Sequence, residues 1–241
     1  MGKWFEDWFA DKDYLKVYGH RDSDDAKQLI ETVLSQIDVP KNAKVLDAAC
    51  GAGRYSHLLA GKGFNVTGFD LSKQLLEVAN KNFEHSVNLF RADLRSIQFK
   101  EKFDLIFNVF TSFGYFESDE ENFLFIKNAY TFLHNGGYFV FDFLNKDFVI
   151  NNLNPKTEKE LDGLSIVETR EIVDGRVVKK ITLRRDQGIK EFVESVRLYD
   201  KDKIISEFEN IGYNVKKVFG DYLGKEYNSQ QSARLIIIFQ K

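Results

Sequence analysis

The chain has 241 residues, of which 43% are hydrophobic and 29% charged, and its net charge at pH 7 is −3. This composition is typical of one soluble α/β domain, and the charge disfavours a broad nucleic-acid footprint. No apolar run approaches the length of a membrane span. The single Cys50 excludes both an intramolecular disulfide framework and an iron-sulfur cluster held by several cysteines. We therefore expect a cytoplasmic protein without membrane contact or a metal site.

The apolar periodicity alternates between helix and strand, which is typical of a doubly wound sheet. Two helices are expected within residues 4–37, the second beginning after Ser23 or Asp24. The strands that should follow are residues 44–49, 65–69, 87–91, 104–110 and 137–143. The helices between them are expected at residues 55–61, 73–82 and 120–133. The turn at Asn135-Gly136-Gly137 should end the last of these helices and open the next strand.

The pattern changes after Asn145 and predicts an antiparallel β insertion. Its three expected strands are residues 164–173, 176–185 and 189–199, joined by turns at Asp174-Gly175 and at Asp186-Gln187-Gly188. A helix at 203–211 and a strand pair at 213–219 and 234–239 should then return to the main sheet. We expect residues 1–145 and 201–241 to form the main domain. Residues 146–200 would form the insertion, which serves as a lid or as a dimer surface.

The most informative motif is the run Val45 to Arg54, an apolar stretch that leads through Asp47 into the turn Gly51-Ala52-Gly53. A second apolar stretch ends in Asp70. A glycine turn lets the backbone approach a ligand, and a carboxylate at the tip of the next strand can accept both ribose hydroxyl protons. The pair predicts an adenosine site, a geometry that NAD, FAD and S-adenosylmethionine share.

Two residues favour one of these ligands. The dinucleotide fingerprint has a third glycine where this chain has Ser56, and its first strand seldom needs an acid such as Asp47. Carboxylates would repel a pyrophosphate but would accept hydrogen bonds from an amino group and a ribose. S-adenosylmethionine is therefore favoured over a nicotinamide dinucleotide. Binding of the dinucleotide is the alternative, and it would indicate an oxidoreductase.

Several segments carry a resemblance to a known family. They are Val45 to Gly53, Gly68 to Ser72, Arg91 to Leu94, Phe103 to Asn108 and Leu133 to Gly137. In this order they resemble the motifs of the class I S-adenosylmethionine-dependent methyltransferases. Residues 110–116, 219–222 and 232–235 resemble a bacterial subgroup whose members mostly lack an assigned substrate. The resemblance extends from about Tyr14 to Lys241, and it implies a Rossmann-like sheet of seven strands with the last one antiparallel.

The resemblance also implies roles for individual residues. Asp47 would bind the methionine amino end, Asp70 the ribose, and Asp93 the adenine amino group; a helix N-cap is the alternative role for Asp93. Asn108 and Phe110 would border the sulfonium, unless they simply end a core strand. The full set implied for the cofactor is Tyr18, Asp47, Ala49, Gly51, Gly53, Asp70, Leu71, Asp93, Leu94, Asn108 and Phe110.

Catalytic residues stay unassigned at this level. His20, Tyr115, Arg197 and Tyr199 are candidates by position alone, because they fall in segments expected at the carboxyl ends of the strands. His20 titrates near neutral pH and could act as a base, although a loop histidine more often lies on the surface. Tyr18, Arg21 and Asp142 share the same expected position.

The methyl acceptor is predicted to be a small molecule, methylated on nitrogen or oxygen. Enzymes that methylate nucleobase amines carry Asn or Asp followed by two prolines, whereas Asn108 is followed by Val109 and Phe110. Methylation of cytosine carbon needs a cysteine near the acceptor, and Cys50 lies in the cofactor turn. An RNA or protein methyltransferase, and a sensor that binds S-adenosylmethionine without turnover, remain open alternatives, as do monomer and homodimer.

Overall fold

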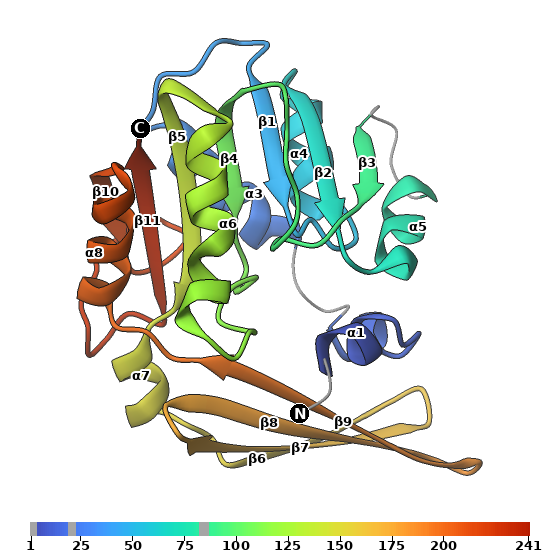
Figure 1. Ribbon diagram of the computed structural model, residues 1–241. Coiled ribbons are helices and arrows are strands. Elements are labelled where there is room, and N and C mark those ends of the chain that lie inside the picture. Colours follow the sequence, from blue (N-terminus) through green and yellow to red (C-terminus); the bar gives the residue numbers. More distant parts are fainter. Residues whose placement is uncertain (1–3, 19–22, 82–86) are drawn as a thin grey trace.

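The computed structural model describes residues 4–18, 23–81 and 87–241. Its main sheet has the strand order β10-β11-β5-β4-β1-β2-β3 (Figure 1). The strands are β1 (Lys44–Ala48), β2 (Asn65–Asp70), β3 (Asn88–Arg91), β4 (Phe103–Asn108), β5 (Leu133–Leu144), β10 (Asn214–Phe219) and β11 (Arg234–Gln240). Strands β1 to β5 are mutually parallel, and β11 runs antiparallel to both of its neighbours. The predicted seven-stranded Rossmann-like sheet with an antiparallel last strand is confirmed.

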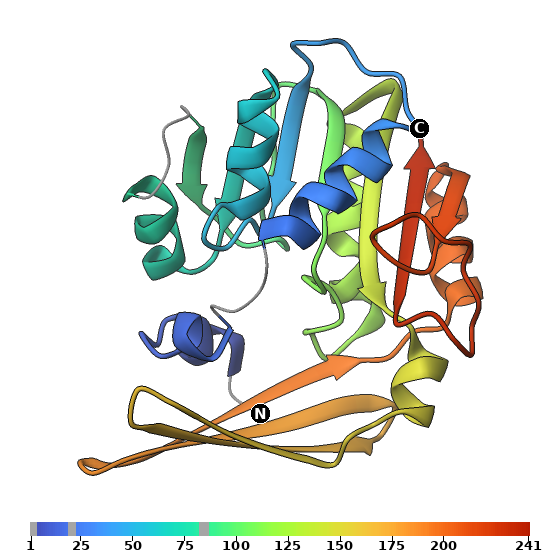
Figure 2. The ribbon, with the colours of Figure 1, turned by 180° about the vertical axis from the view of Figure 1, so that it is seen from behind.

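Helices cover both faces of this sheet because its central strands are apolar on both sides (Figures 1 and 2). Successive residues of a strand point to opposite faces, so Val45 joins the core beneath α3 and α4, and Leu46 the core beneath α6 and α8. These helices are α3 (Ser23–Leu34), α4 (Arg54–Gly61), α6 (Asp119–Thr131) and α8 (Lys201–Ile211). A further helix, α5 (Lys73–Lys81), packs on β2 and β3. The ends of strands β1, β2 and β4 are thereby held rigidly.

A second, antiparallel sheet is built in the order β6-β7-β8-β9. Its elements are β6 (Lys156–Leu161), β7 (Leu164–Val173), β8 (Arg176–Arg185) and β9 (Gly188–Arg197), preceded by α7 (Lys146–Asn151). Asp174 and Gly175 both have positive φ, 50° and 71°, as the tight turn between β7 and β8 requires. The sequence predicted three of these strands. It missed β6, whose run Lys-Thr-Glu-Lys-Glu-Leu is mostly exposed and lacks apolar alternation.

Two short helices, α1 (Trp4–Phe9) and α2 (Tyr14–Tyr18), lie between the main sheet and the second sheet (Figures 1 and 2). The expectation of two helices within residues 4–37 is wrong, because this region contains three. Asp11 and Asp13 lie in the segment between α1 and α2. Their carboxylates form ion pairs with the second sheet, Asp13 with Arg185 at 2.6 Å and Asp11 with Lys190 at 2.7 Å.

Two predicted boundaries are also corrected. Strand β4 ends at Asn108 because Phe110 and Thr111 adopt positive φ, 62° and 65°, which no strand accommodates. Strand β5 begins at Leu133, and the expected turn at Asn135-Gly136-Gly137 is an irregularity within the strand, where its register with β4 shifts. In the part of the chain that the structure describes, no helix is long and apolar enough to cross a membrane.

Candidate functional site

A cavity of about 810 Å³ lies at the carboxyl ends of β1, β2 and β4, the edge at which open α/β sheets bind ligands. Its walls come from three parts of the molecule: the loops of the main sheet, helices α1 and α2, and the inner face of the second sheet. Its volume lies within the range of about 300–1,000 Å³ that small-molecule and cofactor sites occupy. The cavity is therefore large enough for more than a single small group.

At one end of the cavity, Asp70 is held by backbone donors. The amide of Gly51 donates to Asp70 Oδ2 at 2.8 Å, and the amide of Ser72 donates to Oδ1 at 2.8 Å. Burial raises the pKa of Asp70, while these hydrogen bonds oppose the shift. Since a carboxylate can accept about four hydrogen bonds, Asp70 keeps acceptor capacity for a ligand.

Asp47 lies beside it and is 1% exposed. Ser56 Oγ donates to Asp47 Oδ2 at 2.5 Å, so the residue that occupies the third glycine position serves as a partner of this acid. Burial raises the pKa of Asp47 to about 6. Neither Asp47 nor Asp70 forms an ion pair within the described residues. Two buried carboxylates that form no ion pair with another described residue suit a ligand that brings its own positive charge.

The turn that joins β1 to α4 explains its glycines. Gly53 has φ 79°, and a Cβ atom there would lie 2.9 Å from Ala79 Cβ, so a larger residue would push α4 away from α5. Gly51 and the non-glycine Ala49 also have positive φ, 56° and 58°. This conformation brings the main chain of the turn to the cavity wall, where Ala49 and Gly51 line it.

The structure brings most of the predicted cofactor residues together. Those that line the cavity are Tyr18, Asp47, Ala49, Gly51, Asp70, Leu71, Asp93, Leu94 and Phe110. Gly53 packs beneath the turn, and Asn108 Nδ2 donates to the carbonyl of Ala48 at 3.3 Å, which ties β4 to β1. Asp93 is bound in a fork by Arg95, with Arg95 Nη2 2.7 Å from Asp93 Oδ2. The N-cap alternative for Asp93 is wrong, because no helix follows it.

The candidates for catalysis fare differently. Tyr115 lines the cavity, next to Trp4 and Phe5 of α1. The expected positions of Tyr199 and Arg197 at the mouth are wrong. Tyr199 is 5% exposed, and its hydroxyl donates to Asp119 Oδ1 at 2.6 Å. Arg197 lies outside the cavity, near the carbonyl of Asp174 and the Asp119 carboxylate.

Both side chains miss the mouth because β9 ends at Arg197. The chain then leaves the second sheet toward α8, and Tyr199, which lies between β9 and α8, enters the core of the main domain. Burial and the hydrogen bond to Asp119 raise the pKa of the Tyr199 hydroxyl. His20 and Arg21 lie outside the described residues.

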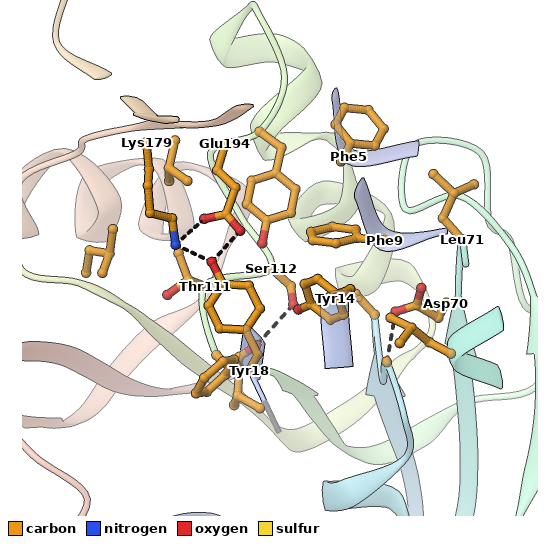
Figure 3. Close-up of a pocket in the computed structure, with 18 of the residues that line it drawn as sticks. Phe5, Phe9, Tyr14, Tyr18, Asp70, Leu71, Thr111, Ser112, Lys179 and Glu194 are labelled. Atoms are coloured by element: carbon orange, nitrogen blue, oxygen red, sulfur yellow. Dashed lines mark hydrogen bonds and ion pairs between the residues drawn. The ribbon is translucent and has the colours of Figure 1, made fainter. Parts of the chain in front are cut away.

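Sequence reasoning missed a polar cluster on the opposite wall (Figure 3). The hydroxyl of Tyr18 donates to Glu194 Oε1 at 2.5 Å, and Lys179 Nζ lies 2.6 Å from Glu194 Oε2. Lys179 also donates to the Tyr18 hydroxyl, and Trp8 Nε1 donates to Glu194 Oε1 at 2.7 Å. Lys179 lies two residues after Val177, so both side chains point to the inward face of β8, and this spacing could have identified Lys179.

Comparison with known proteins adds to this geometry. Residues 45–137 match a family described as a methyltransferase domain. The chain is 25% identical over 248 residues to a Bacillus subtilis (strain 168) protein named "Putative methyltransferase YqeM", an alignment that covers 95% of this chain and 94% of that protein. It is 31% identical over 108 residues to the "Ubiquinone biosynthesis O-methyltransferase" of Coxiella burnetii (strain Dugway 5J108-111), covering 45% of this chain and 46% of that relative.

Solved structures share the whole architecture. An S-adenosylmethionine-dependent methyltransferase from Clostridium acetobutylicum ATCC 824 has a TM-score of 0.81 at 21% identity, with 95% of both chains covered. The S-adenosylmethionine-bound CalS10, an amino pentose methyltransferase from Micromonospora echinaspora, has a TM-score of 0.72 at 18% identity, with 95% of this chain and 97% of that chain covered. At these identities the likeness establishes the shared fold.

Proposed function

We propose that the chain is a class I S-adenosylmethionine-dependent methyltransferase that methylates a nitrogen or oxygen atom of a small molecule. The match of residues 45–137 to a methyltransferase domain supports this proposal. The proposed cofactor is S-adenosyl-L-methionine, and the product formed from it is S-adenosyl-L-homocysteine. When bound, the cofactor supplies a methyl group on a sulfonium, which is open to in-line displacement. The protein's task is then to bind, orient and exclude water.

The acidic end of the cavity fits the cofactor. We propose that Asp70 accepts hydrogen bonds from the ribose hydroxyls and that Asp47 receives the amino group, since both acids are buried and lack an ion-pair partner. The side chains of Phe5 and Phe9 line the same cavity as Leu71 and Asp70 (Figure 3). The Ser72 hydroxyl donates to the carbonyl of Phe9 at 2.6 Å. This contact holds α1 over the adenosine end, where it would exclude water.

The observation that carries the small-molecule acceptor is the extension of the cavity away from the acids. There it is enclosed by α2, by α7 with the loop after it, and by the second sheet; we call this part the acceptor half. Its lining residues include Tyr18, Phe148, Asn154, Thr157, Arg170, Lys179 and Glu194. A space walled on these sides suits a molecule that enters the cavity whole. We propose that residues 146–200 act as the wall of the acceptor half.

The charges of the acceptor half also argue against a nucleic acid. Among the described residues that line it, Lys179, Arg234 and Arg170 each already have a carboxylate partner. Lys179 pairs with Glu194 at 2.6 Å, Arg234 with Asp142 at 2.8 Å, and Arg170 with Glu168. Proteins bind a nucleic acid through Lys and Arg side chains that neutralise its backbone phosphates. Paired cations offer little of this attraction, so a neutral or weakly charged acceptor is favoured.

Two of the similar proteins support the choice of atom. One is named as an O-methyltransferase of ubiquinone biosynthesis, and the other as an amino pentose methyltransferase. The first name states methylation on oxygen, and the second names an amino pentose. We propose the same broad class for this chain, with a cytoplasmic location and either a monomeric or a homodimeric state.

The test is release of S-adenosylhomocysteine after S-adenosylmethionine is mixed with the protein and a fractionated bacterial extract. The small-molecule filtrate should support release, and the retained macromolecules should not. The Asp70→Ala variant is the matched control that should remove release. Release with the macromolecules alone would establish an RNA or protein methyltransferase. Tight binding of S-adenosylhomocysteine without release from either fraction would favour a sensor.

A further inference from the structure

The turn that follows β4 has an unusual backbone. Phe110 and Thr111 are consecutive non-glycine residues with φ 62° and 65°, and Thr111 is β-branched, the type of side chain that tolerates this conformation least. Five described residues other than glycine have positive φ; Asp162 and Asp174 lie in hairpin turns, whereas Ala49, Phe110 and Thr111 line the cavity. Backbone strain in this fold therefore gathers at the candidate site.

One acid holds the turn in this shape. The amide of Phe110 donates to Asp142 Oδ2 at 2.9 Å, and the amide of Thr111 donates to the carbonyl of Asp142 at 3.2 Å. Arg234 Nε donates to Asp142 Oδ1 at 2.8 Å, and Arg234 Nη2 donates to Thr111 Oγ1 at 3.0 Å. The Tyr222 hydroxyl adds a longer bond, 3.3 Å, to Asp142 Oδ2. Both strained residues are thus fixed through Asp142 and Arg234.

Sheet topology brings these residues together. Strand β5 pairs in parallel with β4, so Phe141 lies opposite Asn108 and the next residue of β5, Asp142, reaches the turn. Strand β11 pairs with β5 on its other side and places Arg234 opposite Leu144, two residues beyond Asp142. The pair Asp142 and Arg234, which we call the clamp, therefore depends on the antiparallel last strand, although the turn that it holds follows β4.

Support of the fold alone does not explain this arrangement. A glycine at position 111 would adopt the same turn without strain. A buried ion pair is also a weak source of stability, because apolar residues of similar volume often replace one without loss. Asp142 is 1% exposed, so its charge is fully withdrawn from water. Strain and a buried charge pair at the same cavity wall together point to a functional constraint.

We propose that Asp142 and Arg234 are positioning residues that hold Phe110 and Thr111 in the left-handed conformation where the cofactor end and the acceptor half of the cavity meet. The inference rests on the proposed division of the cavity into these two parts. The other side of the turn is also fixed. Arg54 lies 4.9 Å from the centre of the Phe110 ring, and Ser112 Oγ donates to the carbonyl of Val109 at 3.1 Å.

The first test uses thermal unfolding. Thr111→Gly and Thr111→Ala both lose the hydroxyl, but only glycine tolerates positive φ without strain. With Asp142 present, the glycine variant should melt about 2–4 °C above the alanine variant. An Asp142→Ala background loses the carboxylate that binds the Phe110 amide and Arg234 and keeps only the bond from the Thr111 amide to the carbonyl of residue 142, so this difference should shrink. An equal difference in both backgrounds would show that Asp142 does not hold the strain.

The second test uses S-adenosylhomocysteine, whose binding is measured by calorimetry. Asp142→Ala should raise its dissociation constant about ten-fold, because Phe110 lines the cavity at the cofactor end. Asn145→Ala is the control: this buried residue follows β5 and binds the carbonyls of Ser229 and Ser232, not the turn. It should lower the melting temperature and leave the affinity unchanged. Equal affinity losses in both variants would reduce Asp142 to a structural residue.

If Asp142→Ala alone does not fold, the double variant Asp142→Ala/Arg234→Met removes both charges and takes its place in both tests. Neither measurement needs the methyl acceptor. A macromolecular acceptor would overturn the proposed function and leave these outcomes unaffected, whereas their failure would remove the clamp and leave the proposed acceptor class intact.

Discussion

The two ends of the cavity are assembled in different ways. At the cofactor end, Asp47, Gly51 and Asp70 come from consecutive elements and lie within one strand, turn, helix and strand unit. On the opposite wall, Tyr18 meets Lys179 and Glu194 across 161 and 176 residues of sequence. The first end is therefore fixed by local structure. The second exists only after the N-terminal helices dock on the second sheet.

Their electrostatics differ as well. The acids of the cofactor end are held by backbone amides and by Ser56, and they lack an ion-pair partner within the described residues. The cations of the acceptor half are neutralised by Glu194, Glu168 and Asp142. One end is thus prepared for a cationic ligand, whereas at the other end these three described cations are balanced by three carboxylates. The predictions below test this contrast, from the largest expected effect to the smallest.

Removal of the central carboxylate of the polar cluster should have the largest effect. Glu194→Ala leaves the Lys179 ammonium, the Tyr18 hydroxyl and Trp8 Nε1 without this acceptor. Because three polar contacts are lost at roughly 1 kcal/mol each and Lys179 keeps, among the described carboxylates, only the more distant Glu168, at 3.9 Å, the free energy of unfolding should fall by about 3 kcal/mol. Urea unfolding measures it. Glu191→Ala, which removes an exposed partner of Lys180 on the same strand, is the control and should change stability little.

The Glu194 variant should still bind S-adenosylhomocysteine with nearly normal affinity, because its partners lie on the wall of the acceptor half. A large loss of that affinity in a folded variant would mean that the two ends are not separable.

The contrast also explains what the sequence could reveal. The cofactor end was predictable because its chemistry is carried by a short motif: an acid, two glycines at positive φ and a second acid one strand later. The polar cluster was not, because nothing near Glu194 indicates that Tyr18 will lie against it. Tyr199 shows the reverse error. The alternating pattern of the expected strand continues to residue 199 and predicts Tyr199 on its face. In the structure β9 ends at Arg197, and the next residues turn into the core.

The backbone of the turn after β4 was equally hidden from the sequence. Residues 104–110 show the apolar character of a strand, and no glycine marks the positive φ of Phe110 and Thr111. The conformation depends on Asp142 and Arg234, which follow later in the chain. A pattern reports local preference, and here tertiary hydrogen bonds override it.

The acid that we propose to bind the ribose should give the next effect. Asp70→Ala removes charge-assisted hydrogen bonds worth roughly 1.5–3 kcal/mol, so the affinity for S-adenosylhomocysteine should fall by about ten-fold or more. Calorimetry with S-adenosylhomocysteine and NAD measures both ligands, and NAD should not bind. Asp202→Ala removes an exposed acid on α8 and is the control. An unchanged affinity in folded Asp70→Ala would place the ribose acid elsewhere.

The pH dependence of cofactor binding should come from Asp47. Burial raises the pKa of this acid to about 6, so its carboxylate is charged above that pH and protonated below it. A bound amino group favours the charged form. Affinity for S-adenosylhomocysteine should therefore be constant above about pH 7 and fall by up to about ten-fold for each unit below pH 6, about 1.4 kcal/mol.

The Asp47→Asn variant should bind more weakly at pH 7 and lose this dependence. A wild-type affinity that stays flat between pH 5 and pH 7 would show that Asp47 is ionised throughout, or that it does not face the amino group.

The smallest effect should separate two tyrosines that the sequence placed at the same mouth. Tyr199 is in the core, and its hydroxyl bonds Asp119 Oδ1 and Asn122 Nδ2. Tyr199→Phe removes these bonds and should lower the free energy of unfolding by about 0.5–1.5 kcal/mol. Binding of S-adenosylhomocysteine and its release with the small-molecule filtrate should stay unchanged.

Tyr18→Phe makes the same chemical change on the cavity wall, where the hydroxyl bridges Lys179 and Glu194. It should reduce release with the filtrate while affinity for S-adenosylhomocysteine is retained. If Tyr199→Phe reduced release as much as Tyr18→Phe does, the separation between the core tyrosine and the cavity tyrosine would be wrong.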